Sequence, residues 1–152
     1  MAGRFRFRLE SLLKLRKSLE QEAQRHLGRT VAQRNEVEAR LQDLNLRHQQ
    51  ALESRRTETG QPIDLTFWRA VERWLVVLEQ RIEAASEELR QAEAQVEAAR
   101  KALTKAHQEH LMLLRLKERR KALHDLELLR EEAAAADELA VLRHRFQSRS
   151  AS

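Results

Sequence analysis

The sequence predicts an all-α fold: a long antiparallel coiled-coil hairpin of two helices, with the second helix overhanging at its C-terminal end. Three observations support this prediction. The 152 residues include only three Gly, one Pro and 4% aromatic residues. Ala, Glu, Leu, Arg, Gln and Lys dominate instead, and all of them favour helix. Finally, two apolar stripes with helical spacing flank the one Pro, so each half of the chain predicts a helix that can pack against the other.

We expect a single domain over residues 1–152. Its parts are helix 1 over about 5–56, a tip loop over about 57–64, helix 2 over about 65–146 and a disordered tail over 147–152. In the tip loop, Gly60 suits the position that follows a helix C-terminus, and Pro62 cannot continue helix 1. Asp64 can cap the N-terminus of helix 2.

The second half of the chain carries the stronger stripe. Its apolar residues recur at alternating steps of four and three, which is the spacing of a seam against another helix. The stripe consists of Val71, Leu75, Leu78, Ile82, Ala85, Leu89, Ala92, Val96, Ala99, Leu103, Ala106, His110 and Leu113. The partner stripe, interrupted by Arg34, consists of Leu13, Leu19, Ala23, Leu27, Thr30, Val37, Leu41, Leu44, His48 and Ala51.

Two registers of this hairpin keep the seam intact. The numbers of facing residues add to about 119 in one and, a heptad further, to about 126 in the other, and both stay open. In either register Leu113 faces the start of helix 1, and the seam then turns polar at Lys117 and Arg120. The rest of helix 2 carries a new apolar stripe that predicts a partner, although fraying or self-association is the alternative. This stripe consists of Ala122, Leu126, Leu129, Ala133, Ala136 and Ala140.

Composition and spacing argue against chemistry. The chain has no Cys, which excludes disulfides and thiolate nucleophiles. His107 and His110 share a helix face, but the Glu-x-x-His spacing of helical metal sites is absent, so we interpret His110 as a seam residue. No apolar run approaches the roughly 18 residues of a membrane span or resembles a secretory signal. We therefore expect no catalytic residue, cofactor, metal or small-molecule substrate.

The net charge of +5 is concentrated at the start of the chain. Six basic residues and one acidic residue lie within residues 1–17, and a second basic cluster spans residues 115–121. A partner-binding arm is the favoured interpretation, and a mitochondrial transit peptide is the alternative. Nucleic acid is a less favoured partner, because no recognition motif accompanies the charge. Among the few aromatic residues, Phe5, Phe7, Phe67, Trp68, Trp74 and Phe146 are candidate anchors for partner proteins, with packing under the tip loop the alternative for Phe67 and Trp68.

Four segments resemble the bacterial flagellar export protein FliJ family. They are FRFRLESLLKLR at 5–16, VEAAR at 96–100, LKERR at 116–120 and DELA at 137–140. The resemblance covers nearly the whole chain. It implies a non-enzymatic component of the flagellar type III export apparatus, shaped like the stalk of rotary ATPases. Its implied partners are the hexameric export ATPase, the export gate membrane protein and export chaperones.

The resemblance also implies two groups of binding residues. For the ATPase these are Arg4, Phe5, Arg6, Phe7, Arg8, Leu12, Arg119, Arg120, Leu123, Leu126, Leu142, Arg143 and Phe146; for the gate and chaperones they are Leu46, Gln50, Phe67, Trp68 and Trp74. We expect a monomer in isolation, in the bacterial cytoplasm and peripherally associated with the inner membrane at the flagellar base. The alternatives are a generic coiled-coil scaffold or adaptor, and the equivalent stalk protein of a virulence-type secretion system.

Overall fold

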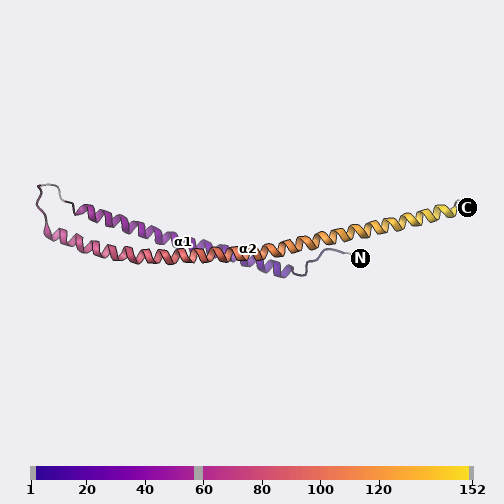
Figure 1. The fold of residues 1–152 in the computed structure, drawn as a ribbon, viewed down its shortest axis with the longest axis horizontal. Helices are drawn as coiled ribbons and strands as arrows, with labels where there is room; N and C mark the ends of the chain where they lie inside the picture. The colour runs from indigo at the N-terminus through magenta and orange to yellow at the C-terminus, as the bar shows by residue number, and fades with distance from the viewer. Residues whose placement is uncertain (1–2, 57–59, 151–152) are drawn as a thin grey trace. The chain divides into compact units, whose positions relative to one another are not determined.

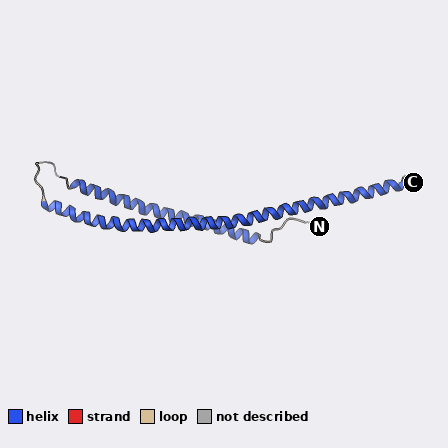
Figure 2. Cartoon of the chain, in the orientation of Figure 1, coloured by secondary structure: helices blue, strands red, loops and turns tan. Residues whose placement is uncertain are grey.

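The computed structural model describes residues 3–56 and 60–150, which form two helices. Helix α1 is Glu10–Ser54 and helix α2 is Leu65–Ser150 (Figure 1). The helices run antiparallel and contact each other, and no strand occurs in the described part of the chain (Figure 2). The predicted all-α helical hairpin is therefore confirmed.

The helix boundaries differ from the prediction at both ends of the chain. Helix α1 begins at Glu10, because residues 3–9 form a non-helical arm that turns into the helix at residues 8–9. Helix α2 continues to Ser150, so residues 147–150 are helical and not a tail. They contain no Gly or Pro that would end the helix. Residues 151–152 of the expected tail lie outside the described residues.

The start of α2 is capped as predicted. The Asp64 Oδ1 atom accepts hydrogen bonds from the backbone N–H groups of Thr66, at 3.1 Å, and Phe67, at 3.3 Å. Gly60 has a φ of 94°, in the left-handed region that glycine tolerates best. However, α1 already ends at Ser54, so Gly60 belongs to the loop and does not follow the helix terminus directly. Residues 57–59 of the expected loop lie outside the described residues.

The contacts of the chain form two compact units. The terminal unit combines Met1–Glu20 with Ala106–Ser152, and the tip unit is Gln21–Lys105.

An apolar seam holds the tip unit together. Its buried side chains are those of Val37, Ala51, Val71, Leu75, Leu78, Ala85, Ala92, Val96 and Ala99. Leu78 is fully buried, in a cluster with Ala51, Val71 and Leu75 against which Leu44 packs. The predicted stripe is thus the core, and its Ala positions allow the two backbones to approach closely.

Two polar residues interrupt this seam on α1. Thr30 is buried, and its hydroxyl donates a hydrogen bond of 2.9 Å to the Leu27 carbonyl. Arg34 is half-buried, and its Nε atom is buried without a hydrogen-bond partner in the described part of the chain. The interruption predicted at Arg34 therefore lies in the seam itself.

The ion pairs between the helices define the register. In the tip unit, Arg40 pairs with Glu88 at 2.8 Å and Arg55 with Glu72 at 3.0 Å, residue numbers that add to 128 and 127. In the terminal unit, Lys117 pairs with Glu10 at 2.9 Å, and these numbers add to 127. Both units therefore adopt the register near 126 and not the register near 119.

Candidate partner-binding site

The N-terminal arm of the terminal unit is docked on α2. Phe7 is buried, with 7% of its surface exposed, and Arg120 stacks over its ring with 5.8 Å to the centroid. The rings of Phe5 and His124 lie 5.5 Å apart in a tilted arrangement. The Glu10 N–H also donates to the Phe7 carbonyl at 3.1 Å, which joins the arm to the first turn of α1. Phe5 and Phe7, which we expected to be partner anchors, fix the arm in this structure.

Two ion pairs join α1 to α2 next to the arm. Arg16 pairs with Glu109 at 2.7 Å, and Lys117 pairs with Glu10 at 2.9 Å. In all four residues the side chain is between 34% and 40% exposed. Lys117, where the sequence predicted that the seam turns polar, therefore still faces α1.

A carboxylate and two imidazoles join α1 to α2 at the inner end of the terminal unit. The two oxygens of Glu20 accept hydrogen bonds from the Nδ1 atoms of His107, at 2.7 Å, and His110, at 2.5 Å. The side chains of Glu20 and His110 are only 13% and 14% exposed. The hydrogen bond from His107 lowers the pKa of Glu20 from its ordinary 4.5; burial opposes this shift, and the hydrogen bond from His110 and the charges of both imidazoles add to it.

Sequence reasoning missed Glu20 because it followed apolar residues alone. We placed Leu19 in the seam, but Leu19 is 45% exposed, and Arg16 and Glu20 face α2 in its place. The steps of three and four from Leu13 to Ala23 pass through Arg16 and Glu20. That spacing, taken without regard to polarity, is the signal that could have identified Glu20.

Beyond the arm, α2 continues without a facing helix (Figure 1). We call residues 125–150 the overhang; at 1.5 Å per residue it is about 40 Å long. Apart from half-buried Leu128, its residues are exposed. The exposed fractions are 44% for Leu126, 55% for Leu142 and 78% for Phe146. Exposed apolar side chains in such a series mark a surface for another protein.

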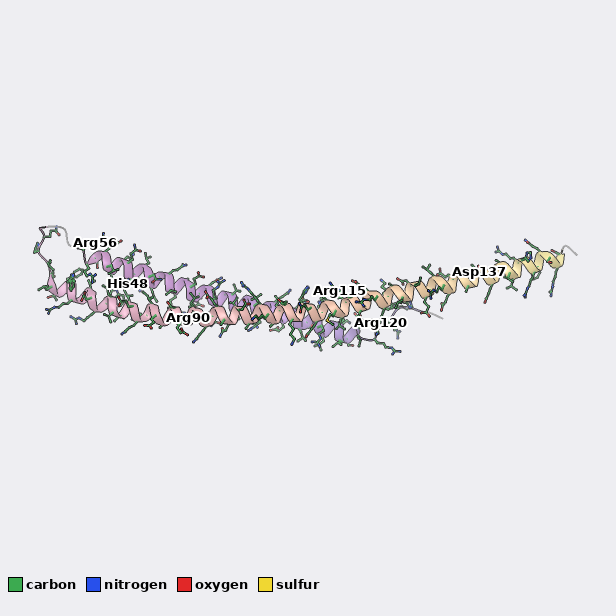
Figure 3. All side chains as sticks on the ribbon, viewed as in Figure 1. His48, Arg56, Arg90, Arg115, Arg120 and Asp137 are labelled. Carbon is green, nitrogen blue, oxygen red and sulfur yellow. The ribbon has the colours of Figure 1, made fainter. Side chains whose placement is uncertain are left out.

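The predicted ATPase-binding residues therefore fall into three places, all of them in the terminal unit. Exposed Arg4, Arg6 and Arg8 lie on the arm with Phe5 and Phe7, and Leu12 is half-buried in the first turn of α1. Exposed Arg119, Arg120 and Leu123 lie on α2 beside the arm, and Arg115 and Arg120 are labelled in Figure 3. Leu126, Leu142, Arg143 and Phe146 lie on the overhang, where Asp137 marks the middle.

The second predicted group lies in the tip unit. Phe67 and Trp74 are 52% and 38% exposed and lie two turns apart on one side of α2. Trp68 is half-buried, with the Arg55 guanidinium 5.5 Å from its ring centroid. On α1, Leu46 and Gln50 are exposed and one turn apart. The structure thus leaves four of these five side chains exposed. Trp68 packs under Arg55, and the Arg81 guanidinium also lies 5.5 Å from the ring centroid of Trp74.

No group of three or more His, Asp or Glu side chains within residues 3–56 and 60–150 could hold a metal ion. In the same residues, neither helix contains a stretch apolar enough to cross a membrane.

Comparison with protein families gives one result. A model of a family described as Flagellar FliJ protein matches residues 5–149, from the docked arm to the end of the overhang. The chain belongs to the FliJ family. Neither a curated protein nor a solved structure matches it at a significant level. The family match associates the chain with flagellar protein export and favours the flagellar system over a virulence-type one.

Proposed function

We propose that this FliJ-family chain is a non-enzymatic stalk of the flagellar export apparatus whose terminal unit binds the hexameric export ATPase. The observation that carries the proposal is the overhang, a helix that continues past the arm with apolar side chains exposed along it. Such a helix gains free energy when a partner covers these side chains. The chain would act by binding the ring more tightly in some conformations than in others, without chemistry of its own.

The tip unit supports a second contact in the same apparatus. Phe67, Trp74, Leu46 and Gln50 are accessible there, and rigid aromatic side chains are effective anchors in protein interfaces. We propose that these residues bind the export gate membrane protein and export chaperones. The protein would then be a monomer in isolation, held at the cytoplasmic side of the inner membrane by its partners.

The test measures ATP hydrolysis by the cognate export ATPase with and without the chain. The key variant combines Leu126→Ala, Leu129→Ala and Leu142→Ala, three exposed overhang residues whose truncation leaves the hairpin seam intact. The control combines Leu46→Ala, Phe67→Ala and Trp74→Ala at the tip. We expect the wild type and the tip variant to bind and stimulate the ATPase equally, and the overhang variant to bind about tenfold more weakly or worse.

Two results would count against this function. If the folded wild-type chain neither binds nor stimulates the ATPase, the stalk proposal is wrong and a scaffold that links other proteins becomes the better explanation. If the tip variant loses ATPase binding together with gate binding, the proposed division between the two units is wrong.

A further inference from the structure

The N-terminal part of α2, in the tip unit, carries exposed arginine and apolar side chains on one face. We call this surface the tip face, and it consists of Phe67, Arg69, Arg73, Trp74, Val77 and Arg81. All six residues are exposed, and none of the three arginines forms an ion pair within residues 3–56 and 60–150. The Arg81 guanidinium lies 5.5 Å from the Trp74 ring centroid, which holds these two side chains together on the face. The proposed function gives the arginines of this face no role.

The tip face is separated from the carboxylates of the same part of α2. Successive residues of a helix are about 100° apart, so the six side chains of the face lie within about half of the helix circumference. Residues 66–81 contain two carboxylates, Glu72 and Glu79, and both lie outside that half, on the other flank of the buried seam. There Glu72 pairs with Arg55, and Glu79 lies 3.3 Å from the His48 imidazole. The tip face therefore has three positive charges and no negative charge.

The tip face has a limited length. From Phe67 to Arg81 it extends about 21 Å along α2, at 1.5 Å per residue. Glu83, Glu87 and Glu88 follow within two turns, so the run of positive charge without carboxylates ends at Arg81. A partner that is attracted by positive charge therefore contacts the tip and not the whole length of α2.

The chemistry of the tip face matches the surface of an anionic membrane. Arginine side chains donate hydrogen bonds and accept none, and the phosphate oxygens of lipid headgroups accept them. Trp and Phe side chains are favoured at the level of the headgroups, where their rings reach the apolar boundary. Val77 lies between Arg73 and Trp74 around the helix, and exposed Ile63 and Leu65 precede the face. A nucleic acid offers similar phosphates but no apolar layer for these side chains.

We propose that the tip face binds the surface of a membrane that contains anionic phospholipids. Its arginines contact the headgroup phosphates, while Phe67, Trp74 and Val77 enter the boundary between headgroups and acyl chains. This contact goes beyond the proposed function, in which the tip unit binds the export gate and chaperones. The two contacts are compatible, because the proposed gate partner is a membrane protein and a tip that it holds lies at a lipid surface.

The test follows the emission of one tryptophan. Trp68 and Trp74 are the two tryptophans of the chain, so this emission reports on the tip and not on the exposed cations of the terminal unit. The full-length chain carries Trp68→Phe, which leaves Trp74 as the one emitter. Its emission is measured with phosphatidylcholine vesicles, with and without about 30% phosphatidylglycerol, at about 50 and 500 mM NaCl. Vesicles with brominated acyl chains then show by quenching whether Trp74 enters the apolar boundary.

Two charge-reversed variants in the same background test the arginines. The tip-face variant combines Arg69→Glu and Arg73→Glu, and it spares Arg81, which contacts Trp74. The matched control combines Lys101→Glu and Lys105→Glu, two exposed cations of α2 at the same spacing, for which the described part of the chain shows no ion pair. Circular dichroism confirms that all three chains have the same helicity.

Anionic vesicles at low salt should shift the Trp74 emission to shorter wavelengths, and brominated lipid should quench it. Vesicles of phosphatidylcholine alone, or high salt, should produce little change. The tip-face variant should need about tenfold more anionic lipid, or worse, for the same shift, and the control should need no more than the parent chain. The lipid contact is wrong if the emission of the parent chain does not respond, if both lipids act equally, or if the two variants respond alike.

Two other ligands distinguish the lipid contact from its alternatives. The same chains are titrated with a DNA duplex of about 20 base pairs and with the export gate protein in phosphatidylcholine nanodiscs. A stronger Trp74 response to DNA than to anionic vesicles would overturn the proposal in favour of nucleic acid. A response to the gate protein but not to anionic vesicles would overturn the lipid contact and leave the proposed function standing. A response to anionic vesicles but not to the gate protein would support the lipid contact and count against the proposed gate contact.

Discussion

The two units of this hairpin use the same pair of helices but are held together by different forces. In the tip unit the helices meet through buried Leu, Val and Ala side chains, and the ion pairs lie at the partly exposed edges of the seam. In the terminal unit they also meet through Glu20 with two imidazoles and through two ion pairs, and the arm adds a tilted contact between the Phe5 and His124 rings. Apolar packing depends little on pH and salt, whereas polar pairing depends on both. The comparison indicates that pH and salt affect the stability of the terminal unit more than that of the tip unit.

Truncation at the centre of the tip unit should have the largest effect. Leu78 has no exposed surface, so Leu78→Ala is expected to lower the free energy of unfolding by about 2–4 kcal/mol through lost burial and a residual cavity. Urea unfolding followed by circular dichroism measures the change. The control is Leu46→Ala, at a side chain that is 53% exposed, with an expected change within about 0.5 kcal/mol. Similar losses of unfolding free energy in the two variants would show that the apolar seam does not hold the tip unit together.

Glu20→Gln should reveal the polar character of the terminal unit. Glu20 accepts two hydrogen bonds and is mostly buried, so we expect a loss of about 1–2 kcal/mol at neutral pH. Because folding lowers the pKa of Glu20 from 4.5, this contribution is complete above that value and disappears as the pH falls through the lowered pKa.

Urea unfolding of wild type and Glu20→Gln over a series of pH values measures this difference. The control is Glu36→Gln, at an exposed residue for which the described part of the chain shows no ion pair. A difference between wild type and Glu20→Gln that persists unchanged into strong acid would contradict the role assigned to the Glu20 carboxylate.

A smaller effect, of opposite sign, is expected at Gly28. This exposed residue lies inside α1 of the tip unit, and a Cβ added there meets nothing within 4 Å. Gly28→Ala should raise the free energy of unfolding by about 0.5–1 kcal/mol, because Ala loses less conformational entropy in a helix. The midpoint of thermal unfolding would rise accordingly. A loss of stability would mean that a group not found near Gly28 in this structure packs against its backbone and clashes with the added Cβ.

The smallest effect should come from the ion pairs at the edge of the tip unit. Arg40 and Glu88 lie 2.8 Å apart, but their side chains are 50% and 47% exposed. Arg40→Gln should therefore change stability by less than about 0.5 kcal/mol, and by still less in high salt. A larger, salt-sensitive loss in urea unfolding would remove the contrast between the units, because charge would then also hold the tip unit together.

The sequence predicted the parts of this molecule that repeat. The stripe from Val71 to Leu113 is long enough to specify a helix and its buried face, and Asp64 carries a cap that acts locally. The sequence did not determine the register of the two helices, because a seam of Leu and Ala tolerates a shift of one heptad. It became visible only through cross-helix pairs such as Arg40 with Glu88.

The candidate site was predicted less well, for a related reason. Glu20 breaks the apolar pattern of the seam, and its role depends on imidazoles 87 and 90 residues away in the chain. The docking of Phe5 and Phe7 involves a short non-helical segment, which has no helical periodicity in its sequence. The overhang was easier to predict, because its exposed apolar residues occur within one uninterrupted helix.

The docked arm also determines how the protein can be labelled. Since Phe7 is buried against α2 and Phe5 touches His124, a fusion partner or fluorophore attached to the arm would lie close to the exposed cations of this part of α2, Arg119 and Arg120. It would screen those cations or displace the arm, and an interaction assay would then report on the tag. A small label beside Gly60, in the loop between α1 and α2, leaves the terminal unit unaltered and is the better position for imaging or immobilisation.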